Sequence, residues 1–114
     1  MSLSSDLPVY HDSYELLLDL FKFIRNFSRE YKFTLGESMK KEMIEMIVNI
    51  YRANSSFEKR KENIQKAREN VETIRLFLRL SNDLKLIDID KFVTLNLKLE
   101  RVSKQLTGWR TSSK

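Results

Sequence analysis

The stretch from Ile87 to Arg110, IDIDKFVTLNLKLERVSKQLTGWR, decides the fold of this chain. Its apolar side chains recur at alternating spacings of three and four residues: Phe92, Leu95, Leu99, Val102, Leu106 and Trp109. These are the spacings of core positions in a helix that lies nearly parallel to its neighbours. Asp88 or Asp90 is placed to cap the start of this helix. Because such a seam must be covered, the stretch predicts partner helices.

Leu97 is the exception within this stretch. At about 100° per residue it falls opposite the seam, among Glu100, Arg101 and Lys104. It is therefore either an ordinary exposed leucine or part of a second contact surface.

The composition favours a small helical domain. The chain has 114 residues, enough for one core, with 2 glycines, 1 proline and 32% charged residues. It has no cysteine, which leaves neither disulfides nor thiolate metal sites. Residues 1–14 lack the pattern of a secretory signal, and no apolar run reaches the length of a membrane span. We therefore expect a cytoplasmic protein.

Residues 1–12, which include Pro8, form a polar segment that we expect to be a flexible lead-in. A bundle should then occupy residues 13–110, followed by a polar tail at 111–114. The first helix is predicted from Ser13 to about Tyr31, with Asp12 or Ser13 as its N-cap.

This first helix carries two neighbouring apolar stripes. One contains Tyr14, Leu17, Phe21, Ile24 and Ser28, and the other contains Leu16, Leu20, Phe23 and Phe27. Together they cover more of the helix than one bundle face needs. Either the helix is central and deeply packed, or the second stripe, with Leu97, is an oligomer interface.

Two further helices are predicted between these segments. One runs from Thr34 to about Ala53, with Thr34 and Glu37 placed as a capping box. The other runs from about Ser56 to Leu84. Short connections between four such helices predict an all-α, antiparallel up-down-up-down four-helix bundle. The expected core includes Phe21, Met43, Ile47, Val71, Ile74, Leu78, Leu95, Leu99 and Val102.

The residues give little support for catalysis. His11 is the only histidine, and no phosphate-binding glycine loop, HExxH or GxSxG motif is present. Carboxylates such as Glu42 and Glu45 are spaced like those of ordinary charged helix faces. We expect no enzyme, no cofactor and no metal site.

Basic residues are the stronger functional signal, with 21 Lys and Arg against 16 Asp and Glu. Lysines and arginines also cluster near the start of the third predicted helix, where Lys59 and Lys66 lie. Rows of cations on long helices suit nucleic-acid phosphates, although they also serve to solvate a helix. The candidate nucleic-acid-binding residues are Lys61, Arg68, Arg75, Arg79, Lys98, Arg101, Lys104 and Arg110.

Three segments resemble one known family: NIYRAN at 49–54, IRLFLRLSNDL at 74–84 and KQLTGW at 104–109. The chain resembles the S23 / 23S rRNA intervening-sequence four-helix-bundle family over about residues 13–109. Within it, the sequence is most similar to the accessory variability determinant (Avd) branch of diversity-generating retroelements. NIYRAN stands where many intervening-sequence members carry a NIAEG-like stretch, which favours the accessory branch.

This resemblance implies a basic homo-oligomer, typically a pentamer, that binds a reverse transcriptase and RNA and supports mutagenic copying. Two alternatives remain open. One is that the chain is an intervening-sequence bundle of unknown role, and the other is that it is a helical module that binds only protein.

Overall fold

The computed structural model describes residues 7–113, and all the regular elements in that range are helices. Four are long: α1 (Pro8–Ile24), α3 (Leu35–Ser55), α4 (Arg60–Asp83) and α5 (Ile89–Ser112). A single turn, α2 (Arg29–Lys32), lies between α1 and α3. The prediction of an all-helical bundle is confirmed.

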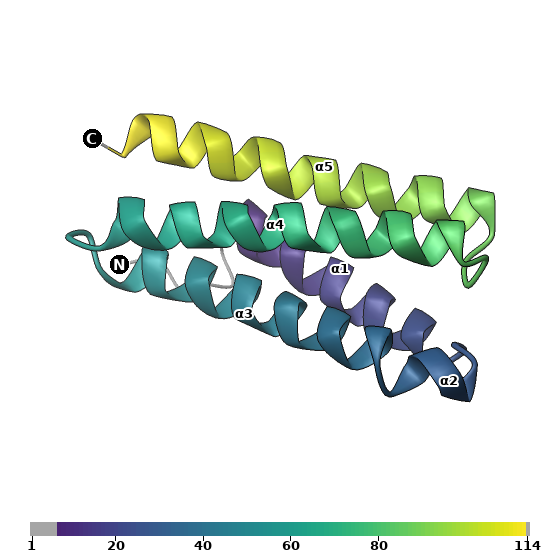
Figure 1. The fold of residues 1–114 in the computed structure, drawn as a ribbon. Helices are drawn as coiled ribbons and strands as arrows, with labels where there is room; N and C mark the ends of the chain where they lie inside the picture. Colours follow the sequence, from purple (N-terminus) through teal and green to yellow (C-terminus); the bar gives the residue numbers. More distant parts are fainter. Residues whose placement is uncertain (1–6, 114) are drawn as a thin grey trace.

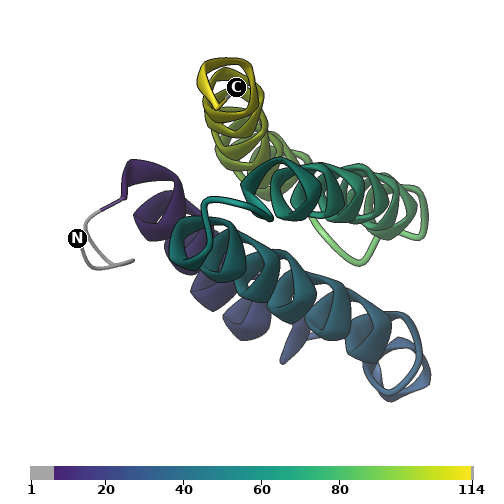
Figure 2. The same cartoon turned by 90° about the vertical axis from the view of Figure 1, so that its left-hand side faces the viewer.

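The long helices occupy the four corners of a rod measuring 43 × 23 × 21 Å. α1 and α4 each pack against both α3 and α5. In Figure 1, each long helix runs back past the one before it, from purple to yellow. Viewed from the end, the same helices surround a common axis (Figure 2). The connection from α3 to α4 and the C-terminal end of α5 lie at the same end of the rod (Figure 1).

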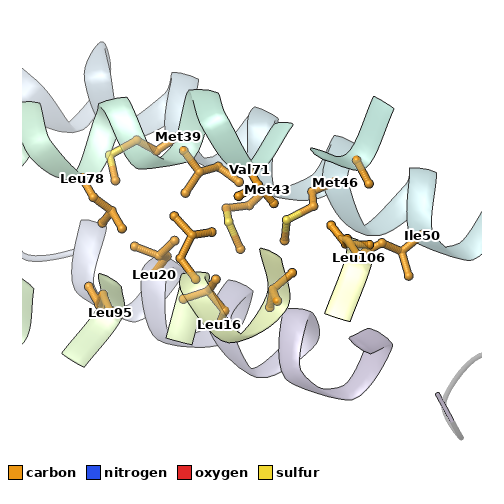
Figure 3. Packing of buried hydrophobic residues seen from close by; sticks show 14 of the residues in the cluster. Leu16, Leu20, Met39, Met43, Met46, Ile50, Val71, Leu78, Leu95 and Leu106 are labelled. Atoms are coloured by element: carbon orange, nitrogen blue, oxygen red, sulfur yellow. The ribbon is translucent and has the colours of Figure 1, made fainter. Parts of the chain in front are cut away.

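The core is built from one buried line of side chains on each long helix. In Figure 3, Leu16 and Leu20 of α1 point toward Met43 and Met46 of α3 and toward Leu95 of α5. Among the predicted core residues, seven are buried, and Phe21 and Ile47 are partly buried against the core. The apolar seam of α5 is confirmed at its four central positions: Leu95, Leu99, Val102 and Leu106.

The first helix begins earlier than expected. Pro8 occupies its first turn, where a proline has no hydrogen bond to lose, so residues 8–12 belong to α1. The rest of the expected lead-in, residues 1–6, lies outside the described range. Ser13 is not an N-cap: it is buried inside α1, and its hydroxyl donates to the Tyr10 carbonyl oxygen at 3.0 Å.

Several other boundaries also differ from the prediction. α1 ends at Ile24 rather than near Tyr31, and α4 begins at Arg60 rather than Ser56. The capping box does not form, because the Thr34 hydroxyl donates to the Glu30 carbonyl oxygen instead. At the start of α5, however, the Asp88 carboxylate accepts a hydrogen bond from the Lys91 amide at 2.8 Å.

Polar contacts fix the helices relative to one another. Between α3 and α4, the Asn49 side chain donates to Asn70 at 2.8 Å, and Asn70 donates to Glu42 at 2.6 Å. Between α1 and α5, Lys98 pairs with Asp19, and Gln105 donates to Asp12 at 2.5 Å. These contacts oppose sliding of the helices along their apolar seams.

Candidate nucleic-acid interface

The candidate cations of α4 lie along the side of the helix that faces α5. Lys61, Arg68 and Arg75 are seven residues apart and Arg79 follows four later, which places them on one face. Arg75 is neutralised there, because its guanidinium pairs with Glu72 of α4 and with Glu100 of α5. Arg68 donates to the neutral Gln65 amide at 3.0 Å and keeps its charge uncompensated.

The candidate cations of α5 also include one that is held in an ion pair and others that are exposed without one. Lys98 pairs with Asp19 of α1 and so helps to hold two helices together. Arg101, Lys104 and Arg110 are exposed. No ion pair to another residue within 7–113 engages these three.

Two of the eight candidate cations therefore act as structural ion-pair partners. Five are exposed and form no ion pair within the described range, and we call these five the basic row: Lys61, Arg79, Arg101, Lys104 and Arg110. Exposed Lys and Arg side chains on two adjacent helices can contact successive phosphates of a nucleic-acid strand.

A groove between α4 and α5 adjoins the basic row. Its lining includes Leu76 and Arg79 from α4, and Phe92 and Asn96 from α5, around a volume of about 350 Å³. The lining also contains Glu72 and its ion-pair partner Arg75, so the groove combines the unpaired Arg79 guanidinium with apolar, amide and acidic surface. Such a surface can hold a phosphate beside a base or a partner side chain.

Three of the five residues expected at an oligomer interface are buried in the core of a single chain. Leu16 and Leu20 are fully buried within one chain and Phe27 is 5% exposed, so they belong to the core. Phe23 is partly buried and makes an edge-to-face contact with Phe27. Leu97 is 65% exposed, and its role as a contact residue stays a prediction.

The structure exposes further apolar side chains, some of them next to Leu97. The α5 face consists of Ile89, Val93 and Leu97, each four residues after the last and each exposed. Other exposed apolar side chains lie on α1 and α3, and we refer to them together as the α1–α3 face: Tyr14, Leu18, Ile44, Val48 and Tyr51. On α3 the exposed residues are four and three apart, which was visible in sequence, but the neighbouring stripe that contains Met39, Met43 and Met46 dominated the pattern.

Three potential metal ligands meet on the first turns of α1, which sequence reasoning did not single out. Each of His11, Asp12 and Glu15 offers an atom within 4.8 Å of the others. His11 and Glu15 are exposed, and Asp12 is engaged by Gln105 of α5. One exposed helix turn is an ordinary surface arrangement, and we assign no metal to it.

Within residues 7–113, no helix has the combination of length and apolar character needed to cross a membrane. The family model described as bAvd-like matches residues 9–113, which include all of the long helices except Pro8. No curated protein matches the chain in sequence.

Proposed function

This chain belongs to the bAvd-like family, and from that membership we propose a non-enzymatic accessory role in a diversity-generating retroelement. In this role the protein binds RNA and the retroelement reverse transcriptase. The observation that supports RNA binding is the basic row on α4 and α5, whose five cations have no intramolecular ion pair within the described residues.

The RNA contacts of this proposal are mainly to phosphates. Backbone contacts by Lys and Arg position a nucleic acid without reading its bases. Arg68 supports the row from the same face of α4, whereas Arg75 and Lys98 support it only by holding α5 in place. Binding should therefore tolerate changes of RNA sequence and weaken as salt rises.

The second part of the proposal is a homo-oligomer, with five copies suggested by the family resemblance. Its support is the pair of exposed apolar surfaces, the α5 face and the α1–α3 face. Two different faces on one subunit can meet head to tail, and such contacts generate rings when the rotation closes. Assembly would also bring the basic rows of several chains into one electrostatic field.

Co-purification with the reverse transcriptase of the same retroelement tests this role. We expect tagged protein to retain the polymerase and RNA at low salt, and to release part of the polymerase after nuclease treatment. Retention of RNA without polymerase would contradict the accessory role, and retention of polymerase without any RNA would support a module that binds only protein.

A further inference from the structure

A second group of unpaired cations surrounds a hollow between the end of α3 and the start of α4. The lining residues are Tyr51, Arg52, Ser55, Ser56, Lys59, Glu62, Asn63 and Lys66, around a volume of about 380 Å³. We call this the α3–α4 hollow. It lies on the side of α4 that faces α3, away from Arg75 and the groove toward α5.

The charge around this hollow is strongly positive. Arg52, Lys59 and Lys66 come from two helices and the turn between them, and all three are exposed. Glu62 is the single acidic side chain in the lining. None of these four residues has an ion pair within the described part of the chain. Three converging cations raise the local concentration of anions.

Asn63 is an independent sign of a ligand. This residue is only 6% exposed, and its side-chain amide makes no hydrogen bond within residues 7–113. Polar groups this deeply buried normally have a hydrogen-bond partner, which at Asn63 must be solvent or a bound molecule. The amide is not sealed from solvent, and the residue lines the hollow, so its NH₂ group can donate to a molecule bound there.

The backbone around the hollow also favours an anion. The first turn of α4 begins here, and the N-terminal end of a helix carries partial positive charge. The opposite charge at the end of α3 is offset by Arg60, whose guanidinium donates to the carbonyl oxygens of Ala53 at 2.9 Å and Asn54 at 3.4 Å. The Ser56 hydroxyl accepts from the Lys59 amide at 3.4 Å, which leaves its hydrogen available for donation.

We propose that the α3–α4 hollow binds a phosphate group of RNA, held by Arg52, Lys59 and Lys66 and by a hydrogen bond from Asn63. This inference rests on the proposed function and adds a second contact region to it. The strand would then engage α4 on two sides, at the basic row toward α5 and at the hollow toward α3. Free phosphate shares the same chemistry, so the test must separate the two sources.

The decisive experiment compares two variants of equal charge. One carries Arg52→Gln, Lys59→Gln and Lys66→Gln, and its control carries Lys22→Gln, Arg25→Gln and Arg29→Gln, which are exposed cations of α1, α2 and their connection. Affinity for a fluorescent single-stranded RNA is measured from about 50 to 200 mM salt. We expect the hollow variant to bind at least about tenfold more weakly than its control, with a slope of log K against log salt that is shallower by about 0.7, because one phosphate of a single strand is no longer neutralised.

A neutral substitution separates the hollow from general charge. Asn63→Ala leaves the net charge unchanged and should still weaken RNA binding, whereas Asn26→Ala, at an exposed position, should not. Circular dichroism confirms that each variant is folded. Equal RNA affinity of the hollow variant and its control overturns the inference while leaving the proposed function intact, provided that the unaltered protein binds RNA.

A second experiment tests whether the hollow binds free phosphate rather than a phosphate group of RNA. Thermal unfolding is measured in phosphate and in chloride at matched ionic strength. One outcome is that phosphate stabilises the unaltered protein but not the hollow variant, while the hollow variant binds RNA as tightly as its control variant does. In that case the hollow is a site for small anions, and the inference that it binds RNA is wrong. If the unaltered protein binds no RNA at low salt, the RNA-binding part of the proposed function fails together with the inference.

Discussion

Gly36 and Gly108 both lie in helices, yet an added methyl group would meet very different surroundings. A Cβ at Gly36 would stand 2.7 Å from the Cγ2 atom of Ile24, which is a fully buried, β-branched side chain. A Cβ at Gly108 would meet nothing within 4 Å. Gly36 therefore allows the start of α3 to approach the end of α1 closely.

Alanine at these two glycines should change stability in opposite directions. We expect Gly36→Ala to lower the free energy of unfolding by about 1–3 kcal/mol, because the packed Ile24 methyl group must move. Gly108→Ala, the matched control, should raise it by up to about 1 kcal/mol through helix propensity. Urea unfolding monitored by circular dichroism measures both. A stabilised Gly36→Ala variant would show that the two helices do not meet as closely as described.

Individual residues also show where sequence reasoning about the site reached its limit. In sequence, Arg75 and Lys98 look as available as Arg79 and Arg101. Arg75 has Glu72 three residues before it, but its second partner, Glu100, lies on another helix. The partner of Lys98 is Asp19, which is 79 residues away in sequence. Only the packed bundle brings these charges together, so helix periodicity could not separate the structural cations from the exposed ones.

At the scale of the helices, the seam of α5 and the buried stripes of α3 and α4 were predictable from spacing alone. α1 was not, because its two apolar stripes are almost equally hydrophobic. Leu16 and Leu20 of one stripe and Ile24 of the other are buried because α1 packs against both α3 and α5. Tyr14 and Leu18 were thereby left exposed. Spacing identifies a face of a helix, but the positions of neighbouring helices decide which of two such faces is covered.

The exposed α5 face and the buried Leu20 predict which substitutions disrupt assembly and which disrupt folding. Val93→Glu with Leu97→Glu should leave the helical content unchanged and reduce self-association, because both side chains are exposed on the α5 face. The control, Thr94→Glu with Thr107→Glu, adds the same charge at exposed polar positions of α5. Leu20→Glu should unfold the chain, since its side chain is fully buried.

Sedimentation at micromolar concentration distinguishes the outcomes. We expect an oligomer for the unaltered protein and for the Thr94/Thr107 variant, and smaller species for the Val93/Leu97 variant. Unchanged sedimentation of the Val93/Leu97 variant would exclude the α5 face from the interface. A Leu20→Glu variant that is folded but monomeric would show that the stripe containing Leu16 and Leu20 is an oligomer interface, as the sequence suggested.

At the scale of the whole molecule, a net charge of +5 is modest for the RNA binding that we propose. The fold makes this charge effective by distributing it. Where helices meet, ion pairs neutralise cations such as Arg75 and Lys98. Other Lys and Arg side chains have no ion-pair partner and lie on both sides of α4. The overall charge follows from the composition. That Arg52 and Asn63 line the same hollow could be recognised only from the packing of α3 against α4.

In the proposed function, the exposed basic row holds RNA by its phosphates. The salt dependence of RNA affinity tests this proposal in a variant that combines Arg79→Gln, Arg101→Gln and Lys104→Gln. The control is the Lys22, Arg25 and Arg29 variant of equal charge, and affinity is measured from about 50 to 200 mM salt. We expect weaker binding to RNAs of different sequence alike, with a slope shallower by about 0.7 for each phosphate of a single strand that the variant no longer neutralises. An affinity and slope equal to those of the control would contradict the claim.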